Sequence, residues 1–146
     1  MKSKFLITII CLIGVTSFAQ KNITWDDLAD VEFETKFFPA YEGYFLYPYF
    51  SPSIIALEGS RVTITGYFLD IDPKGKLFIL SKGPMSACFF CGIGGPETAM
   101  ELQFDSKPKF KLDDILSVTG ILKLNRDDVM HFNYILTDVE AKLKNE

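Results

Sequence analysis

Apolar and polar positions alternate in five separate stretches through the second half of the chain. These stretches are rich in β-branched and aromatic residues, and glycine, proline, asparagine and aspartate separate them, a pattern that predicts β-strands. The five predicted strands span residues 61–72, 76–81, 99–104, 116–124 and 132–141. Five short strands with turns between them favour a small barrel or sandwich.

Two of the predicted strands carry a glycine near the middle, Gly66 and Gly120. A glycine inside a strand allows a sharp bend or the close approach of another backbone, and the strands of a barrel need one or the other. The patterns Val-x-Ile-x-Gly and Val-x-Gly-x-Leu around them are typical of a five-stranded oligonucleotide/oligosaccharide-binding (OB) barrel. We therefore predict an all-β protein with an OB-like barrel over residues 59–146, and an open β-sandwich is the alternative.

Residues 20–58 are predicted to form a short N-terminal helix and an aromatic-rich extended strap, both packed on the core. Thr24 and Asp27 have the spacing of a helix cap, and alternation over 31–34 limits the helix to two turns. Residues 37–52 are dense in aromatics and interrupted by prolines, which favours an extended strap with a short strand near 44–47. A stacking platform for a ligand is the alternative, although aromatic residues more often pack in a core.

The first nineteen residues have the features of a secretory signal peptide. Lys2 and Lys4 precede an apolar run over 5–15, and Ser17-Phe18-Ala19 fits the small-x-small cleavage rule. The apolar run is shorter than the ~20 residues that a spanning helix needs. We therefore expect cleavage after Ala19, a mature protein that does not span the membrane, and a periplasmic or secreted location.

The charge balance argues against a nucleic-acid partner. The chain has 15 basic and 19 acidic residues, and loss of Lys2 and Lys4 with the signal peptide leaves 13 against 19, a formal charge of −6. Nucleic-acid affinity depends largely on lysine and arginine contacts to phosphates, so a negative exported domain is unsuited to it.

Cysteine placement gives the one chemically specific feature. Cys11 lies in the predicted signal peptide, so Cys88 and Cys91 remain, in the sequence Cys-Phe-Phe-Cys followed by Gly92. Two thiols three positions apart on a tight turn can bind one metal ion, and a following glycine permits the left-handed backbone that closes such a turn. A closed zinc site needs four ligands.

A metal site is one of three interpretations of the cysteine pair, and it leaves open which groups supply the remaining ligands. Glu97 and His131, the single histidine, are the candidates in this chain, and a cysteine pair from a second molecule would require a homodimer. A small surface disulfide is the simplest alternative for the cysteine pair. A redox-active pair is a third, although it needs a helix N-terminus that lowers a thiol pKa, and no βαβ pattern is present.

Catalytic and organic-cofactor motifs do not emerge from the sequence. One histidine without a paired nucleophile makes a Ser/His/Asp hydrolase unconvincing, and Gly92-Ile93-Gly94-Gly95 neither follows a βαβ strand nor begins a long helix. We therefore expect a protein that is not an enzyme.

Several elements together resemble a known group of proteins. Trp25-Asp26-Asp27-Leu28 follows the signal peptide, and Phe78-Ile79-Leu80-Ser81 leads to the Cys-Phe-Phe-Cys-Gly turn and then to Gly95-Pro96-Glu97. This combination resembles small secreted or periplasmic bacterial proteins with an OB-like core, a family of unknown function. The resemblance covers nearly all of the mature chain and implies export and a barrel fold, with no activity attached.

The sequence thus predicts an exported binding or accessory protein that holds a transition metal, zinc or copper, through Cys88 and Cys91. The alternative is an envelope protein-interaction module in which the two cysteines form an inert disulfide. In the first case the partner is a metal ion, and in the second it is an envelope protein.

Overall fold

The computed structural model describes residues 20–72 and 74–144, so the predicted signal peptide over residues 1–19 lies outside the described residues. The described strands are β1 (Lys21–Asn22), β2 (Val31–Phe38), β3 (Gly43–Phe50), β4 (Arg61–Leu69), β5 (Phe78–Ser81), β6 (Ala99–Leu102), β7 (Ile115–Leu124) and β8 (Tyr134–Leu143). Helical structure in the same residues is limited to short pieces: α2 (Pro52–Ile55) and the 3₁₀ turns η1 (Asp26–Leu28), η2 (Pro39–Tyr41), η3 (Met85–Ala87), η4 (Phe89–Cys91) and η5 (Pro96–Thr98).

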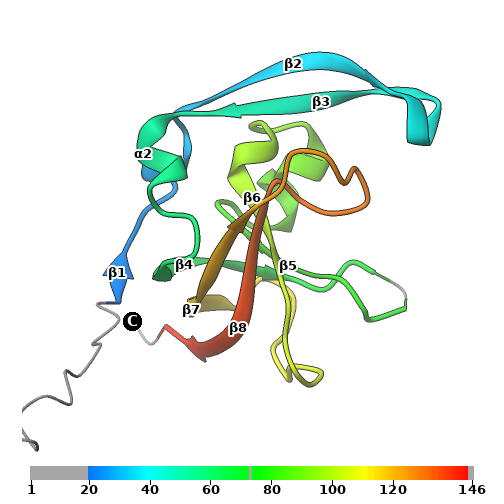
Figure 1. Ribbon diagram of the computed structural model, residues 1–146. Coiled ribbons are helices and arrows are strands. Elements are labelled where there is room, and N and C mark those ends of the chain that lie inside the picture. The colour runs from blue at the N-terminus through cyan, green and yellow to red at the C-terminus, as the bar shows by residue number, and fades with distance from the viewer. Residues whose placement is uncertain (1–19, 73, 145–146) are drawn as a thin grey trace, which may run out of the picture.

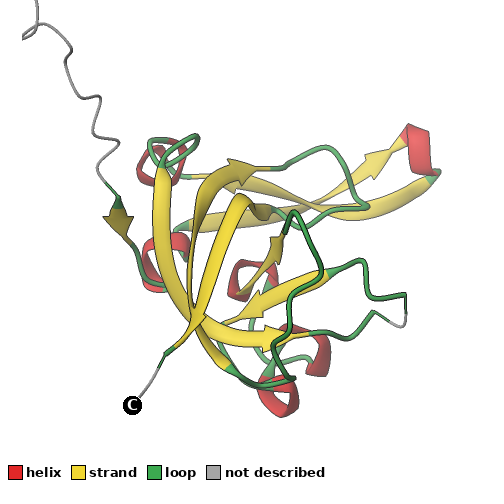
Figure 2. Ribbon diagram, turned by 90° about the horizontal axis from the view of Figure 1, so that it is seen from below, coloured by secondary structure: helices red, strands yellow, loops and turns green. Residues whose placement is uncertain are grey.

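Strands β4, β5, β6, β8 and β7 form a closed five-stranded barrel (Figures 1 and 2), because β4 pairs with β7 as well as with β5. All neighbours are antiparallel except β6 and β8, which are parallel. Each of the five strands predicted from the alternation is present, so the prediction of a β-barrel is confirmed. Two-residue β1 adds to β4 in parallel outside the barrel.

The strands β4 and β5 are shorter than predicted at the ends that face each other. The Asp72 carboxylate accepts hydrogen bonds from the amides of Lys74, Lys76 and Leu77, at 3.0, 2.9 and 3.2 Å. These amides therefore bond within a turn and do not pair with a neighbouring strand. The same hydrogen bonds, that of the Lys74 amide first, lower the pKa of the Asp72 carboxyl group.

The barrel interior follows the alternation of the strands. On β4, Val62, Ile64 and Phe68 point inward and are at most 1% exposed, and on β7 Leu116 and Val118 are fully buried. Such alternation is what one buried face of a strand requires. Phe68 stacks on Phe78 of β5 with ring centroids 5.9 Å apart, which fills the centre of the barrel.

Gly66 and Gly120 lie where the backbone of a neighbouring strand comes close. A Cβ atom on Gly66 would lie 2.7 Å from the Ser81 carbonyl oxygen, and one on Gly120 would lie 2.8 Å from that of Thr137. Gly120 also falls at the register shift in the β7–β8 pairing. The predicted close approach of another backbone at these two glycines is therefore confirmed.

The predicted N-terminal helix is a single 3₁₀ turn, η1, and no α-helix forms there. Thr24 and Asp27 do make the predicted capping contacts, with the Thr24 amide donating to Asp27 Oδ2 at 2.7 Å and the Asp27 amide donating to Thr24 Oγ1 at 3.4 Å. The helix stops early because the chain turns at Ala29, whose carbonyl accepts from the Val31 amide at 2.9 Å, and strand β2 begins at once.

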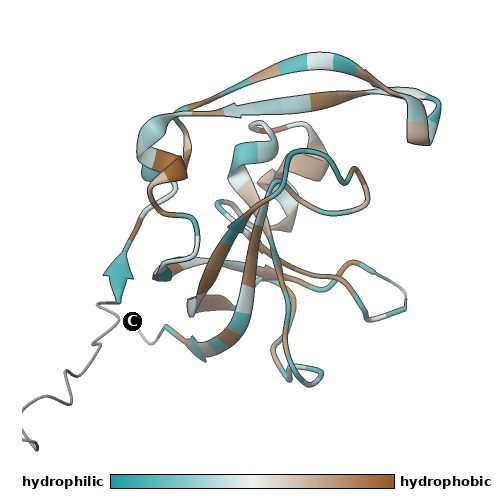
Figure 3. Cartoon of the chain, in the orientation of Figure 1, coloured by the Kyte–Doolittle hydropathy of each residue, from teal (hydrophilic) through white to brown (hydrophobic). Residues whose placement is uncertain are grey.

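The predicted extended strap is instead a long hairpin. Strands β2 and β3 are antiparallel over eight residues each, from the pair Val31–Phe50 at the root to the pair Phe38–Gly43 at the turn. The hairpin reaches over the barrel (Figure 1), and apolar residues recur along both of its strands (Figure 3). At its root Phe50 is 7% exposed and belongs to the core cluster of the barrel. Towards the turn Tyr44 is 72% exposed, and Phe38, at 8% exposed, lies outside that cluster and contacts the rings of Phe45 and Tyr47 of the hairpin itself. Proline does not interrupt this hairpin, because Pro39 lies at its turn and Pro48 lies on the free edge of β3.

The N-terminal segment and the barrel share one hydrophobic core. Leu28, Phe50 and Ile54 belong to the same buried cluster as the inward residues of β4 and β7. Tyr134 of β8 joins the two parts, because its hydroxyl donates to the Leu28 carbonyl at 2.7 Å and its ring lies 5.5 Å from that of Phe50. The root of the hairpin is therefore fixed to the barrel.

Candidate functional site

The cysteine turn lies in the loop between β5 and β6, at one end of the barrel. The loop is closed at its base, where the Lys82 amide donates to the Thr98 carbonyl at 2.9 Å. Three 3₁₀ turns, η3, η4 and η5, follow one another between these points. The loop is tightly folded as well, because a Cβ atom on Gly83 would lie 2.6 Å from the Ala87 carbonyl oxygen. The two cysteines are thus held on a compact, supported turn.

The Cys-Phe-Phe-Cys turn brings the two sulfur atoms together, as the spacing predicts. Cys88 precedes η4 and Cys91 ends it, with Cys88 Sγ and Cys91 Sγ 4.0 Å apart. Both thiols are free, and Cys88 is buried whereas Cys91 is exposed. Gly92 has a φ of 79°, the left-handed conformation that the sequence analysis assigned to it.

Both sulfur atoms also contact the same backbone oxygen. Cys88 Sγ donates to the Met85 carbonyl at 3.2 Å and Cys91 Sγ donates to it at 3.0 Å. Two sulfurs and one oxygen therefore converge on one point of the loop. Sequence reasoning identified the sulfurs but missed the Met85 carbonyl, for which the residue type gives no indication.

The electrostatics of the turn keep Cys91 protonated. Although Cys91 is exposed, local desolvation by the folded turn raises the pKa of its thiol, and the hydrogen bond and charge of the neighbouring Cys88 raise it further. A thioredoxin-type nucleophile needs the opposite, a thiol pKa lowered by a helix N-terminus or a nearby cation. The direction of this pKa shift is the opposite of what the redox-active alternative requires.

Glu97, a predicted metal ligand, is used within its own turn. Its Oε1 accepts a hydrogen bond from the Gly95 amide at 3.1 Å, at the start of η5. Over residues 20–72 and 74–144, no three Cys, His, Asp or Glu side chains gather in a way that could hold a metal ion. The structure thus does not bring Glu97 and His131 to the cysteine pair.

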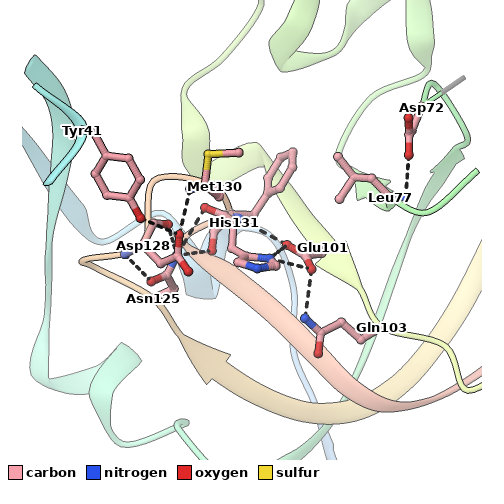
Figure 4. Close-up of polar contacts among 10 residues, drawn as sticks. Tyr41, Asp72, Leu77, Glu101, Gln103, Asn125, Asp128, Met130 and His131 are labelled. Carbon is pink, nitrogen blue, oxygen red and sulfur yellow. Dashed lines mark hydrogen bonds and ion pairs between the residues drawn. The ribbon is translucent and has the colours of Figure 1, made fainter. Parts of the chain in front are cut away.

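His131, the other predicted ligand, contacts a buried glutamate. Its Nδ1 lies 2.9 and 3.0 Å from the two carboxylate oxygens of Glu101 (Figure 4). Glu101 on β6 is 5% exposed, and it also accepts from Gln103 Nε2 at 2.9 Å and from the Phe132 amide at 3.4 Å. An ionised carboxylate only accepts hydrogen bonds, and the tautomer of His131 with its proton on Nδ1 would supply the donor for this contact.

Sequence reasoning missed Glu101. The one available indication was a charged residue inside the strand Ala-Met-Glu-Leu, all four residues of which are buried. A buried carboxylate needs donors around it, and His131 is the side chain that supplies one from the β7–β8 loop.

None of the helices within the described residues is both long and apolar enough to cross a membrane.

The comparisons with known proteins define a class of fold. No family model matches the chain, and no curated protein matches its sequence. The crystal structure of a DUF3299 family protein from Pseudomonas aeruginosa PAO1 superimposes with a TM-score of 0.52 and 14% sequence identity, covering 88% of this chain and 99% of that one. At this identity the likeness shows the fold alone. The chain is an all-β protein with a closed five-stranded barrel, similar in fold to a member of a family of unknown function.

Proposed function

We propose that the chain is an exported, non-enzymatic protein that holds one transition metal ion through Cys88 and Cys91. The observation that carries this proposal is the 4.0 Å separation of the two sulfur atoms on a supported turn. Export is supported by the signal-peptide pattern of residues 1–19.

The sulfur separation suits a shared metal ion. A metal–thiolate bond is about 2.3 Å long. With both sulfurs at that distance, a separation of 4.0 Å corresponds to a sulfur–metal–sulfur angle of about 120°. An ion can therefore bind both sulfurs with little movement of the turn. The exposure of Cys91 leaves a path for the ion from solvent.

The ligand set favours copper over zinc. Glu97 and His131 are engaged elsewhere, so the chain offers two thiolates and, beside them, the Met85 carbonyl oxygen. Soft thiolate ligands select Cu(I), whereas a structural zinc site is almost always four-coordinate. We therefore propose Cu(I) as the ion of a single chain, and zinc only where a second chain adds its own cysteine pair.

We also propose that the barrel is OB-like. The support is the strand order: β4, β5 and β6 follow one another antiparallel, β6 is parallel to β8, and β7 lies between β8 and β4. This arrangement makes a five-stranded Greek-key barrel of the OB type. In such a barrel the β5–β6 loop, which holds the cysteines, is a peripheral connection free to carry a site.

Elemental analysis tests the metal proposal. The exported protein, loaded with Cu(I) under reducing conditions and freed of excess metal, should retain one copper per chain. Cys88→Ser and Cys91→Ser should each lose it, because one thiolate alone cannot chelate. Ser86→Ala, at an exposed position of the same loop, should retain it. Retention of copper by both cysteine variants, or no retention by the wild type, would rule the site out.

The metal affinity is expected to rise with pH. The raised pKa of Cys91 means that its thiol is protonated near neutrality, and a metal ion must displace that proton and the one on Cys88. Loss of two protons per ion gives a rise of about 100-fold per pH unit while both groups are thiols. Competition against a chelator of known affinity, measured from about pH 6 to pH 8, checks this. An affinity independent of pH would mean that the cysteines are not the ligands.

A further inference from the structure

One edge of the β2–β3 hairpin is an unpaired strand that faces the barrel. Within the described residues, β3 pairs with β2 and with no other strand. In Figure 1, β3 is the strand of the hairpin nearer the barrel, and β2 lies on its far side. An unpaired edge presents a row of backbone N–H and C=O groups that can pair with another extended chain.

The position of Pro48 shows which groups of β3 point outward. Residues of an antiparallel pair alternate between those that bond their partner strand and those whose N–H and C=O point away. Pro48 has no N–H and is paired with Phe33, so it fits an outward-pointing position. The Ser51 amide donates to the Asp30 carbonyl at 3.2 Å, which places the inward bonds on the odd-numbered residues of β3. The backbone groups of Tyr44 and Leu46 therefore point away from β2.

A groove of about 440 Å³ lies along this edge. Its lining includes Tyr44, Phe45 and Leu46, three consecutive residues of β3, and no residue of β2. Consecutive residues of one strand line a groove together only when the strand edge faces it, since side chains alternate between faces. The opposite wall, from the β7–β8 loop and the cysteine loop, is largely apolar and includes Phe89 and Met130.

The groove also contains a cation without a carboxylate partner. Arg126 lines it and lies over the Phe50 ring, 5.0 Å from the centroid. The ion pairs in the described part of the chain involve Arg61, Lys82 and His131, and none of them includes Arg126. Asp128, the acidic residue of the groove, already accepts from the Tyr41 hydroxyl at 3.1 Å and the Met130 amide at 3.0 Å. A ligand with an acidic group would complement Arg126.

The hairpin is held at both ends, so its edge is fixed before anything binds. Its root packs on Tyr134 through Phe50, and at its turn the Tyr41 hydroxyl bonds to Asp128 (Figure 4). The Met130 amide, followed by Tyr41, holds the pKa of Asp128 below its ordinary value, so the acceptor stays charged. A strand fixed in this way binds without the entropic cost of ordering a free loop.

We propose that the groove binds an extended segment of a partner protein, which adds as a third strand to β3. The segment bonds the outward backbone groups of Tyr44 and Leu46, places an apolar side chain against Met130 and Phe89, and pairs an acidic side chain with Arg126. Strand addition of this kind takes its affinity from main-chain hydrogen bonds and its specificity from alternate side chains. Pro48 ends the available edge, so the segment is short. This site is separate from the metal ligands proposed above.

Binding of a capped hexapeptide tests the proposal. The probe alternates valine and threonine and carries one central glutamate. Its controls are the same peptide N-methylated along the bonding edge and a version with lysine in place of glutamate. Calorimetry with the whole exported protein should show saturable binding of the probe, with at least about ten-fold weaker binding of both controls. Equal binding of the N-methylated peptide, or no saturable binding of the probe up to millimolar concentration, would overturn the proposal.

Two variants at one position separate the backbone from the side chain. Leu46→Pro removes the outward N–H and leaves the bonds to β2 intact, whereas Leu46→Ala keeps that N–H. We expect binding of the probe to fall about ten-fold or more in L46P and by no more than about three-fold in L46A. Arg126→Gln should remove the preference for glutamate over lysine. Equal binding by L46P and the wild type overturns strand addition. A wild-type dimer that L46P converts to a monomer would identify a second copy of this chain as the occupant and overturn the partner segment.

Discussion

Tyr134→Ala is expected to lower the free energy of unfolding by about 3–5 kcal/mol, the range for removal of a large buried aromatic side chain. Tyr134 is fully buried, and its ring packs on Phe50 at the root of the hairpin. The change leaves a cavity between the barrel and the N-terminal segment and also leaves the Leu28 carbonyl without its donor. Denaturant unfolding followed by circular dichroism measures the loss.

Tyr134→Phe is the matched control. It keeps the ring and removes only the 2.7 Å hydrogen bond to Leu28, so we expect a loss of about 1–3 kcal/mol, the cost of one unsatisfied buried group. Burial, with Glu97 and Asp30 adding to it, raises the pKa of the Tyr134 hydroxyl, so the donor is retained at neutral and moderately alkaline pH. Equal losses for the alanine and phenylalanine variants would show that the ring does not join the two parts.

Gly66→Ala is expected to destabilise the protein by about 1–3 kcal/mol through overpacking. The new methyl group would lie 2.7 Å from the Ser81 carbonyl oxygen and 2.8 Å from Leu80 Cγ, both on β5. The Ser81 oxygen is a backbone atom of the paired strand, so it cannot move aside as a side chain can. The β4–β5 contact that helps to close the barrel must therefore open. The shift in the midpoint of thermal unfolding reports this loss.

Thr65→Ala provides the control for Gly66. It changes the neighbouring, half-buried position of the same strand and brings no new atom near β5. We expect it to cost less than about 1 kcal/mol, the range of strand propensities. A cost for Gly66→Ala no larger than that of Thr65→Ala would mean that the strands adjust freely and that the close approach is not a constraint.

The barrel could be predicted from the sequence because its strands are local patterns. Alternation at Val62, Ile64 and Phe68 identifies a strand with one buried face, and the glycine at position 66 identifies the point where a neighbouring backbone comes close. The strand ends are less predictable. Asp72 ends the regular structure by accepting hydrogen bonds from three amides, and an aspartate before a proline does not reveal in the sequence how many amides it will bind.

The hairpin could not be predicted because a proline can either interrupt a strand or occupy its turn or free edge. Pro39 begins the 3₁₀ turn at the hairpin end, and Pro48 sits on the strand edge where no N–H is needed. Both positions suit a hairpin, yet in the sequence the same residues read as interruptions. Aromatic contacts between the strands, such as Phe37 with Tyr44 at 5.1 Å, compensate for the missing core contacts.

The candidate site was predictable only where its residues are neighbours in sequence. The spacing of Cys88 and Cys91 with Gly92 fixes the turn and brings the sulfurs together. The partner of His131 is thirty residues away on β6 and reaches it because β6 and β8 are parallel neighbours. The contact between His131 and Glu101 depends on which strands are neighbours in the closed barrel, and this order of strands cannot be predicted from composition.

The single indole of the chain has a use that follows from its position. Trp25 is 9% exposed, its Nε1–H donates to the Thr65 carbonyl at 2.8 Å, and its ring lies against Gly66. Its emission therefore reports on the joint between residues 21–25 and β4, and Trp25 is not among the residues that line the groove beside β3. Release of that joint should shift the emission to longer wavelength, whereas a strand added to β3 should leave the spectrum unchanged. Intrinsic fluorescence thus distinguishes partial detachment from ligand capture without any label.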